Sequence, residues 1–199
     1  MNVLAFAGFL GSGKTTVIKN CINSMLRQGL KIAIIENEIG TMSIDDAILN
    51  EGGIEITTLT NGCVCCSISG SLISAAIQIE REINPDWLIV ELTGLAYMTG
   101  IRDLFAERGK QFKLYSVTVI DIARWMKLLK ITRPLLIDQV SGANVILINK
   151  TDITEPTEEE IEEISRLAGG SPVIRASAQN DGERLWDEIS ARLKKPEAM

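Results

Sequence analysis

The first residues with a recognisable chemistry lie near the N-terminus, and their pattern is typical of phosphate binding. Residues 8–15 read Gly-Phe-Leu-Gly-Ser-Gly-Lys-Thr and fit G-x-x-x-x-G-K-[ST] at every fixed position. Glycines let a backbone curl so that several N–H groups face one anion, and a helix starting directly afterwards adds its positive end. The alternative interpretation is a glycine turn that merely joins a strand to a helix.

The polar groups of this segment have separate expected roles. We expect Lys14 to place its charge between the β- and γ-phosphates and to assist catalysis, and the Thr15 hydroxyl to be a ligand of Mg²⁺. The residues expected to bind the nucleotide phosphates are Gly8, Gly11, Ser12, Gly13, Lys14, Thr15 and Thr16.

A second segment, Asn-Lys-Thr-Asp at 149–152, follows an apolar run and suggests a reader of guanine. The Asp152 carboxylate can accept hydrogen bonds from the N1–H and 2-amino groups of guanine, a donor pair that adenine lacks. We expect Asn149 to stabilise the loop and to contact the base edge, and Lys150 to lie over the base. A backbone N–H at Ser177 or Ala178 is expected to meet the guanine carbonyl. An ordinary turn before the next helix is the alternative.

Two acidic residues are candidates for Mg²⁺ binding and hydrolysis. Glu91 ends an apolar run that we expect to be a strand, and a carboxylate there can hold Mg²⁺ directly or through water. Gly94 follows closely and allows a loop to sense the γ-phosphate. Glu38, in the segment Glu-Asn-Glu-Ile-Gly at 36–40, is expected to contact Mg²⁺ or to orient water.

Three clustered thiols suggest a site for a soft metal ion. Cys63, Cys65 and Cys66 lie within four residues, too close for all of them to pair with one another as disulfides. The chain has no histidine, so the fourth ligand of a tetrahedral Zn²⁺ or Co²⁺ would be water, another chain's thiol or a carboxylate, for which we nominate Glu38. Core packing, as expected for Cys21, and a redox switch are the alternatives.

These groups require a scaffold of alternating strands and helices. Apolar runs predict strands at 3–7, 31–35, 54–59, 86–91, 114–120, 144–149 and 172–175, and periodicity predicts helices at 14–28, about 72–83, 157–168 and 182–193. This order predicts an α/β fold of the P-loop NTPase type, a mostly parallel sheet with helices on both faces. We expect one domain over residues 1–193 and a flexible tail over 194–199.

Composition limits the partners and the chemistry. The 199 residues are 46% hydrophobic and carry a net charge of −6, which argues against nucleic acid or an anionic membrane as the main partner. The apolar runs are too short to span a bilayer, and we expect a cytoplasmic protein. The absence of histidine excludes Ser/His and Cys/His catalysis.

The order and spacing of five motifs resemble those of the CobW-type GTPases, relatives of HypB and UreG. The motifs are GFLGSGKTT at 8–16, ENEIG at 36–40, GCVCC at 62–66, ELTG at 91–94 and NKTD at 149–152. The resemblance implies a GTPase that binds GTP or GDP with Mg²⁺ and carries Zn²⁺ or Co²⁺ on the three thiols. It also implies that nucleotide state is coupled to metal delivery, to a client metalloenzyme or a cofactor-assembly protein.

The chain departs from the usual family pattern in two respects. Typical members carry a second, C-terminal domain, often with a histidine-rich stretch, and we expect a partner to replace it. Thr41 and Met42 follow the glycine of the 36–40 segment where an acidic residue is usual.

No arginine is obviously placed as a finger, so we expect slow intrinsic hydrolysis, accelerated by a partner or by homodimerisation.

Two other functions compete with that of a metal-delivering GTPase. One competing function is a nucleotide-gated interaction switch with purely structural thiols. The other, a kinase on the same scaffold, is disfavoured by Asn149 and Asp152.

Overall fold

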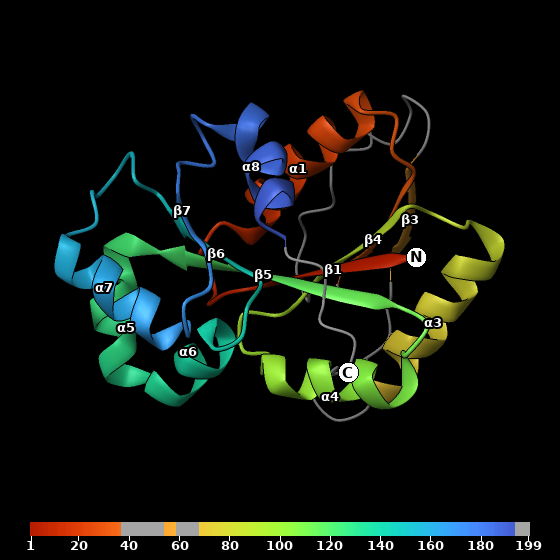
Figure 1. Ribbon diagram of the computed structural model, residues 1–199, viewed down its shortest axis with the longest axis horizontal. Helices are drawn as coiled ribbons and strands as arrows, with labels where there is room; N and C mark the ends of the chain where they lie inside the picture. The colour runs from red at the N-terminus through yellow and green to blue at the C-terminus, as the bar shows by residue number, and fades with distance from the viewer. Residues whose placement is uncertain (37–53, 59–67, 194–199) are drawn as a thin grey trace.

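A seven-stranded sheet forms the centre of the computed structural model, which describes residues 1–36, 54–58 and 68–193 (Figure 1). Its strand order is β3-β2-β4-β1-β5-β6-β7, and every pair of neighbours is parallel. The strands are β1 (Asn2–Ala7), β2 (Ile32–Glu36), β3 (Ile54–Thr58), β4 (Trp87–Glu91), β5 (Lys113–Asp121), β6 (Val145–Asn149) and β7 (Val173–Arg175). The α/β fold class and the predicted strands are confirmed, with ends shifted by a residue.

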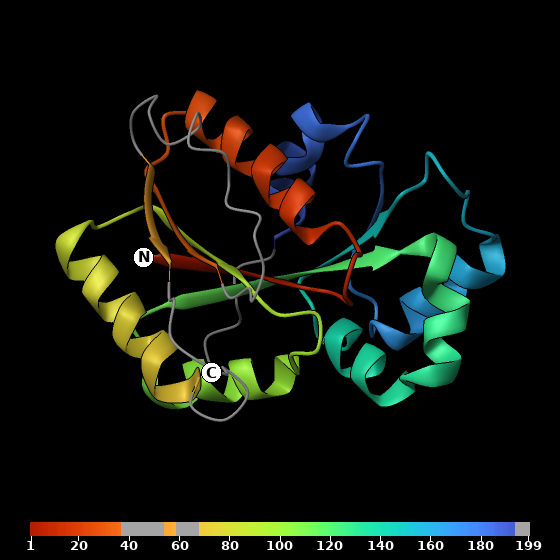
Figure 2. The same cartoon turned by 180° about the vertical axis from the view of Figure 1, so that it is seen from behind.

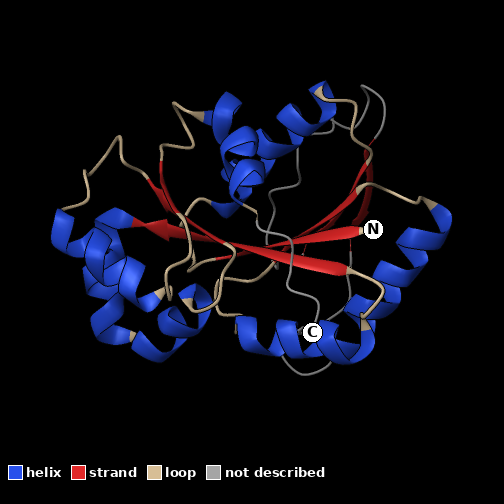
Figure 3. Ribbon diagram, in the orientation of Figure 1, coloured by secondary structure: helices blue, strands red, loops and turns tan. Residues whose placement is uncertain are grey.

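Helices cover both faces of the sheet, as Figures 2 and 3 show. They are α1 (Lys14–Arg27), α3 (Ile68–Glu82), α4 (Met98–Arg108), α5 (Trp125–Ile131), α6 (Arg133–Val140), α7 (Glu158–Leu167) and α8 (Gly182–Arg192), with a 3₁₀ turn η1 (Ile122–Arg124) before α5. Helices α4, α5 and α6 were not among the predicted elements. Helices α5 and α6 matter for the site because they follow β5 and pack beside its carboxyl end.

The central strand shows why the sheet is covered on both sides. Along β1, Leu4 and Phe6 pack in the core beneath α1 and α8, whereas Val3 and Ala5 pack in the core beneath α3 and α4. Such burial on both faces is typical of a parallel sheet. Cys21 lies fully buried in the first of these cores, which confirms its predicted packing role, and burial raises the pKa of its thiol to about 12.

The topology also decides where a ligand can bind. The chain places β4 on one side of β1 and then crosses to β5 on the other side. Ligands of open α/β sheets bind beyond the carboxyl ends of the strands at such a reversal. The loops after β1, β4, β5, β6 and β7 all begin at this edge. In the part of the chain that the structure describes, no helix has the length and apolar character needed to cross a membrane.

Candidate functional site

The loop at residues 8–13, called the phosphate loop below, joins β1 to α1 in a conformation that demands glycine. Gly8 and Gly13 have φ angles of 137° and 97°. A Cβ at Gly8 would lie 2.2 Å from the Val119 carbonyl oxygen, and one at Gly13 would lie 2.3 Å from Asn149 Nδ2. Inside the loop, the buried Lys14 ammonium donates a hydrogen bond to the Gly8 carbonyl oxygen at 3.0 Å.

Two of the three groups predicted to contact Mg²⁺, Thr15 and Glu91, lie side by side. The Thr15 hydroxyl, in the first turn of α1, donates to Glu91 Oε1 at 2.8 Å. Glu91 ends β4, which pairs with β1, and its carboxylate is buried. A hydroxyl and a carboxylate are the oxygen ligands that Mg²⁺ prefers, so this pair fits the ion. Thr16, the next residue, is partly exposed.

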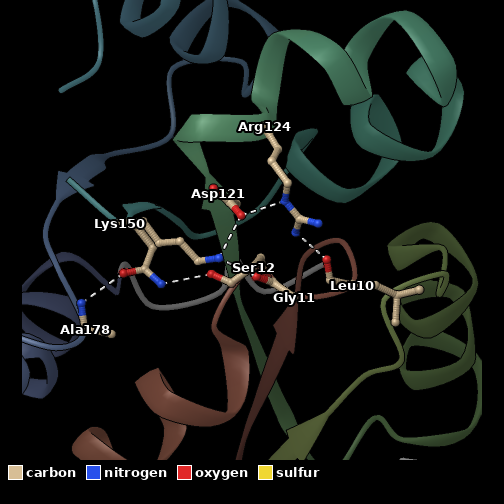
Figure 4. Close-up of polar contacts among 8 residues, drawn as sticks. Leu10, Gly11, Ser12, Asp121, Arg124, Lys150 and Ala178 are labelled. Carbon is tan, nitrogen blue, oxygen red and sulfur yellow. Dashed lines mark hydrogen bonds and ion pairs between the residues drawn. The ribbon is translucent and has the colours of Figure 1, made fainter. Parts of the chain in front are cut away.

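Asn149 ties the phosphate loop to the two loops expected to read the base. Its Nδ2 donates to the Ser12 carbonyl oxygen at 2.9 Å, and its Oδ1 accepts from the Ala178 N–H at 2.9 Å. Figure 4 shows both contacts. The Asn149 side chain is buried, and it connects the end of β1 with those of β6 and β7. Both amide atoms of Asn149 therefore bond to neighbouring loops in this structure, and its contact with the base edge stays a prediction.

The other residues predicted to contact guanine are Asp152, Ser177 and Ala178. Asp152 is exposed. The Ala178 N–H donates to Asn149, and the Ser177 N–H donates to Asp181 Oδ2 at 2.8 Å. Both backbone donors therefore bond to side chains in this structure. Their contact with guanine stays a prediction.

Lys150 lies against the phosphate loop with a positive φ of 66°. Its ammonium donates to the Gly11 carbonyl oxygen and to Asp121 Oδ2, both at 2.8 Å. The sequence indicated a Lys150 stem over the base. The structure shows that its charge reaches across to the end of β5, and the contact of its stem with the base stays a prediction.

Two residues that contact the phosphate loop or its neighbour Lys150 were not among the predicted site residues. Asp121 ends β5 with a buried carboxylate, and Arg124 follows one turn later on η1. Arg124 Nε donates to Asp121 Oδ2 at 2.7 Å, and its Nη2 donates to the Leu10 carbonyl oxygen at 2.5 Å. The available signal was the position of Asp121, a carboxylate directly after an apolar strand. Nothing local indicated the contact of Arg124 with the phosphate loop.

Gln139 of α6 is a third residue that the sequence did not reveal. Its buried Nε2 donates to the carbonyl oxygens of Gly94 and Ala96 at 3.1 and 3.0 Å. These carbonyls belong to residues 92–97, which connect β4 to α4 and are called the β4 loop below. A Cβ on Gly94 would lie 2.5 Å from the Leu10 nitrogen, so the two loops touch.

The predicted soft-metal site lies outside the described residues. This holds for Cys63, Cys65, Cys66 and Glu38 alike. Within the described ranges, no group of three or more cysteine, aspartate or glutamate side chains is placed to hold a metal ion. The thiol site therefore stays a prediction.

Known proteins similar to this chain share both its sequence pattern and its fold. A family model described as "CobW/HypB/UreG, nucleotide-binding domain" matches residues 2–175. The zinc chaperone YjiA of Escherichia coli (strain K12) is 33% identical over 183 residues, which cover 86% of this chain and 56% of that protein. The zinc-regulated GTPase metalloprotein activator 1 of Dictyostelium discoideum is 31% identical, covering 83% of this chain and 42% of that protein.

Solved structures agree. The Zn(II)-bound YjiA GTPase from E. coli has a TM-score of 0.66 at 26% identity, covering 87% of this chain and 57% of that chain. The hydrogenase maturation factor HypB from Archaeoglobus fulgidus has a TM-score of 0.69 at 16% identity, covering 98% of this chain and 91% of that chain, and shows the fold alone. This chain spans about half the length of the curated relatives it matches. Because the family model covers most of the chain, the protein belongs to the CobW/HypB/UreG family through its nucleotide-binding domain.

Proposed function

We propose that this protein binds and hydrolyses GTP and uses the nucleotide state to control the binding and delivery of a transition metal, Zn²⁺ or Co²⁺. Family membership supports the nucleotide, and the names of the relatives, a zinc chaperone and a zinc-regulated GTPase, support the metal. The single observation that carries the proposal is the convergence of Lys14, Thr15 and Glu91 beneath a phosphate loop that Asn149 ties to the base-reading loops.

Each of these groups has a definite task when GTP is bound. The Lys14 ammonium exchanges its bond to the Gly8 carbonyl for the β- and γ-phosphates. Thr15 and Glu91 would hold Mg²⁺, which would supply charge neutralisation for the phosphate oxygens. Glu38 and Glu91 serve in hydrolysis, and Asp152 accepts hydrogen bonds from guanine. The neighbouring Lys150 packs against the base.

Strand register supports a coupling between the nucleotide and the metal. Glu36 at the end of β2 is in register with Thr58 of β3 on one side and with Glu91 of β4 on the other. The segment that carries Glu38 leaves β2, and the segment that carries the thiols leaves β3. The first therefore starts beside β4, the strand that bears Glu91, and the second starts one strand further out. Loss of the γ-phosphate would alter metal affinity by this route, and metal binding would alter nucleotide affinity in return.

The proposed cargo site consists of the Cys63, Cys65 and Cys66 thiolates with Glu38 as the fourth ligand. Soft thiolates favour Zn²⁺, and Co²⁺ accepts the same tetrahedral geometry. The recipient is a client metalloenzyme or a cofactor-assembly protein. Intrinsic hydrolysis is slow and is accelerated by that partner or by homodimerisation, and the protein acts in the cytoplasm.

The decisive experiment compares Zn²⁺ affinity in two nucleotide states. The protein is titrated with Zn²⁺ in the presence of Mg²⁺ and either GDP or a non-hydrolysable GTP analogue, with a chromophoric chelator as competitor. We expect affinities that differ by about 5- to 150-fold, the usual range for coupled sites. Equal affinities would contradict the coupling. Cys65→Ser should weaken Zn²⁺ binding, whereas the matched thiol control, Cys21→Ala, should not.

The same variants test the alternative of a nucleotide-gated interaction switch. If Cys65→Ser leaves metal affinity unchanged, the thiols are structural and the cargo hypothesis is wrong. A tetrahedral thiolate absorption band on Co²⁺ loading, lost in Cys65→Ser and kept in Cys21→Ala, would support the cargo site.

A further inference from the structure

We propose that Arg124, anchored by Asp121, is a positioning residue that aims the Gly11 N–H of the phosphate loop at the phosphates for GTP hydrolysis. The inference rests on the proposed GTPase function and adds to it a residue outside the recognised motifs. Arg124 lies on η1, immediately after β5.

Three consecutive carbonyl groups of the phosphate loop receive hydrogen bonds from side chains at or just after the ends of β5 and β6. The Leu10 oxygen accepts from Arg124 at 2.5 Å, the Gly11 oxygen from Lys150 at 2.8 Å, and the Ser12 oxygen from Asn149 at 2.9 Å. Figure 4 shows Arg124 reaching Leu10 of the loop, with Asp121 between Arg124 and Lys150. The Arg124 contact is the one at the tip.

Peptide geometry converts these contacts into a direction for the N–H groups. The described chain contains no cis peptide bond, and in a trans peptide the C=O of one residue and the N–H of the next point in opposite directions. Holding the Leu10 carbonyl on the Arg124 side therefore turns the Gly11 N–H to the other side. Lys150 and Asn149 do the same for the two peptides that follow.

The N–H group that Arg124 aims is free to bind an anion. The Ser12 N–H closes a turn onto the Phe9 carbonyl oxygen at 3.1 Å. Among the residues that the structure describes, no such bond occupies the N–H of Gly11 or Gly13. Nearby, Lys14 supplies the positive charge for the same ligand. The Gly11 donor is thus oriented before the nucleotide arrives.

A single buried carboxylate oxygen supports two of the three contacts. Asp121 Oδ2 accepts from Arg124 Nε at 2.7 Å and from Lys150 Nζ at 2.8 Å. The Asp121 side chain is only 3% exposed, and both cations bond to its Oδ2, whereas its Oδ1 is buried without a hydrogen-bond partner in the described portion of the chain. Gly11 contributes by lacking a side chain, because a Cβ there would lie 3.1 Å from Arg124 Nη2.

Aiming a donor at the phosphates matters most where charge develops during hydrolysis. Removing one such preoriented donor slows an enzyme by about 10²- to 10³-fold. Loss of Arg124 would misdirect the donor without removing it, so we expect a smaller effect, about 10-fold on kcat. GDP affinity should change less than 3-fold, because Lys14 and the other N–H groups remain.

The test measures kcat, KM and GDP affinity for Arg124→Ala, Arg124→Lys and the control Arg108→Ala. Arg108 is an exposed arginine at the end of α4, so Arg108→Ala removes the same charge as Arg124→Ala. We expect kcat to fall about 10-fold in Arg124→Ala, to recover only partly in Arg124→Lys, and to stay unchanged in the control. Lysine keeps the charge but lacks the fork that reaches Asp121 and Leu10 together.

An NMR measurement makes the result independent of turnover. In ¹⁵N-labelled protein, the Gly11 amide resonance should shift on GDP·Mg²⁺ binding in the wild type and shift much less in Arg124→Ala, while the Gly13 resonance responds in both. An unchanged Gly11 response, an unchanged kcat or full recovery in Arg124→Lys would overturn the inference. A wild type that binds GDP but hydrolyses no GTP would instead refute the proposed function, and the Gly11 response would still judge Arg124.

Discussion

Two loops meet at the carboxyl edge of the sheet and are held in very different ways. In the phosphate loop, the carbonyl oxygens of residues 10, 11 and 12 accept hydrogen bonds from three separate side chains, anchored at the ends of β5 and β6. In the β4 loop, the carbonyls of Gly94 and Ala96 share one amide, that of Gln139. Asp138, also on α6, accepts from the Met98 N–H where α4 begins.

The two loops do not differ in the exposure of their side chains, since Leu10 of the phosphate loop is 50% exposed and Leu95 and Tyr97 of the β4 loop are 58% and 55% exposed. They differ in the number of side chains that hold their backbones. A segment held by few contacts opens more easily than one held by many. The phosphate loop is therefore held in a fixed conformation by several elements. The β4 loop is held through one helix, α6, and its conformation is suited to change with the γ-phosphate.

The largest effect on GTP turnover is expected from a change at Lys14. Lys14→Ala removes the buried ammonium that neutralises the phosphates, and we expect GTP turnover to fall by at least about 100-fold. Lys110→Ala, at an exposed site, should leave turnover unchanged. Phosphate release measured at saturating GTP distinguishes the two variants. If Lys14→Ala kept turnover within 10-fold of the wild type, the phosphate-binding segment would have no essential part in hydrolysis.

A smaller effect is expected where the two loops touch. A Cβ in Gly94→Ala would lie 2.5 Å from the Leu10 nitrogen and 2.8 Å from its Cα, so the loops must separate. Since small displacements of positioning groups slow catalysis, we expect about a 10-fold loss in kcat with GDP affinity largely kept. The matched control is Gly100→Ala in α4, where a Cβ meets nothing within 4 Å. Equal kinetics in both variants would show that the contact has no role.

The attachment of the β4 loop to α6 can be broken at Gln139. Gln139→Leu leaves the Gly94 and Ala96 carbonyls without their donor, and we expect the free energy of unfolding to fall by about 1–3 kcal/mol. Hydrogen exchange should rise in residues 92–97 and stay unchanged in the phosphate loop. Gln78→Leu, at an exposed site on α3, serves as the control. Faster exchange in both loops would contradict the comparison.

The smallest effect calibrates the others at a site remote from both loops. The Thr157 hydroxyl caps α7 by accepting from the Glu160 N–H, and the Glu160 carboxylate accepts in turn from the Thr157 N–H. Thr157→Ala should lower the free energy of unfolding by about 1 kcal/mol without altering kcat. Urea denaturation, with the exposed Thr154→Ala as control, measures it. A change in kcat would show that stability alone affects turnover.

Local patterns in the sequence were enough to predict most of the scaffold. The phosphate loop, the capping box at Thr157 and all seven strands depend on neighbours within a few residues, and each is found where expected. The proximity of Thr15 and Glu91 was also predictable, because both follow parallel strands that end at one edge. Their binding of Mg²⁺ stays a prediction.

The missed helices show where periodicity fails. Helices α5 and α6 have seven and eight residues, too short for a clear apolar repeat. Leu135 and Leu136 of α6 are both buried, although adjacent residues of a helix do not share a face. Packing against the end of β5 thus overrides any pattern in the segment, and Gln139 owes its position to that packing.

What the sequence determined by itself is therefore a set of motifs, each made of residues close together in the chain: a phosphate loop, a segment predicted to read guanine and a cluster of thiols. Only the tertiary structure decided that Arg124 holds the tip of the phosphate loop, across 114 residues. It likewise decided that Gln139 holds the β4 loop, across 45 residues. The reason is physical: such contacts depend on the order in which strands join the sheet, and neither hydrophobic periodicity nor motif spacing encodes that order.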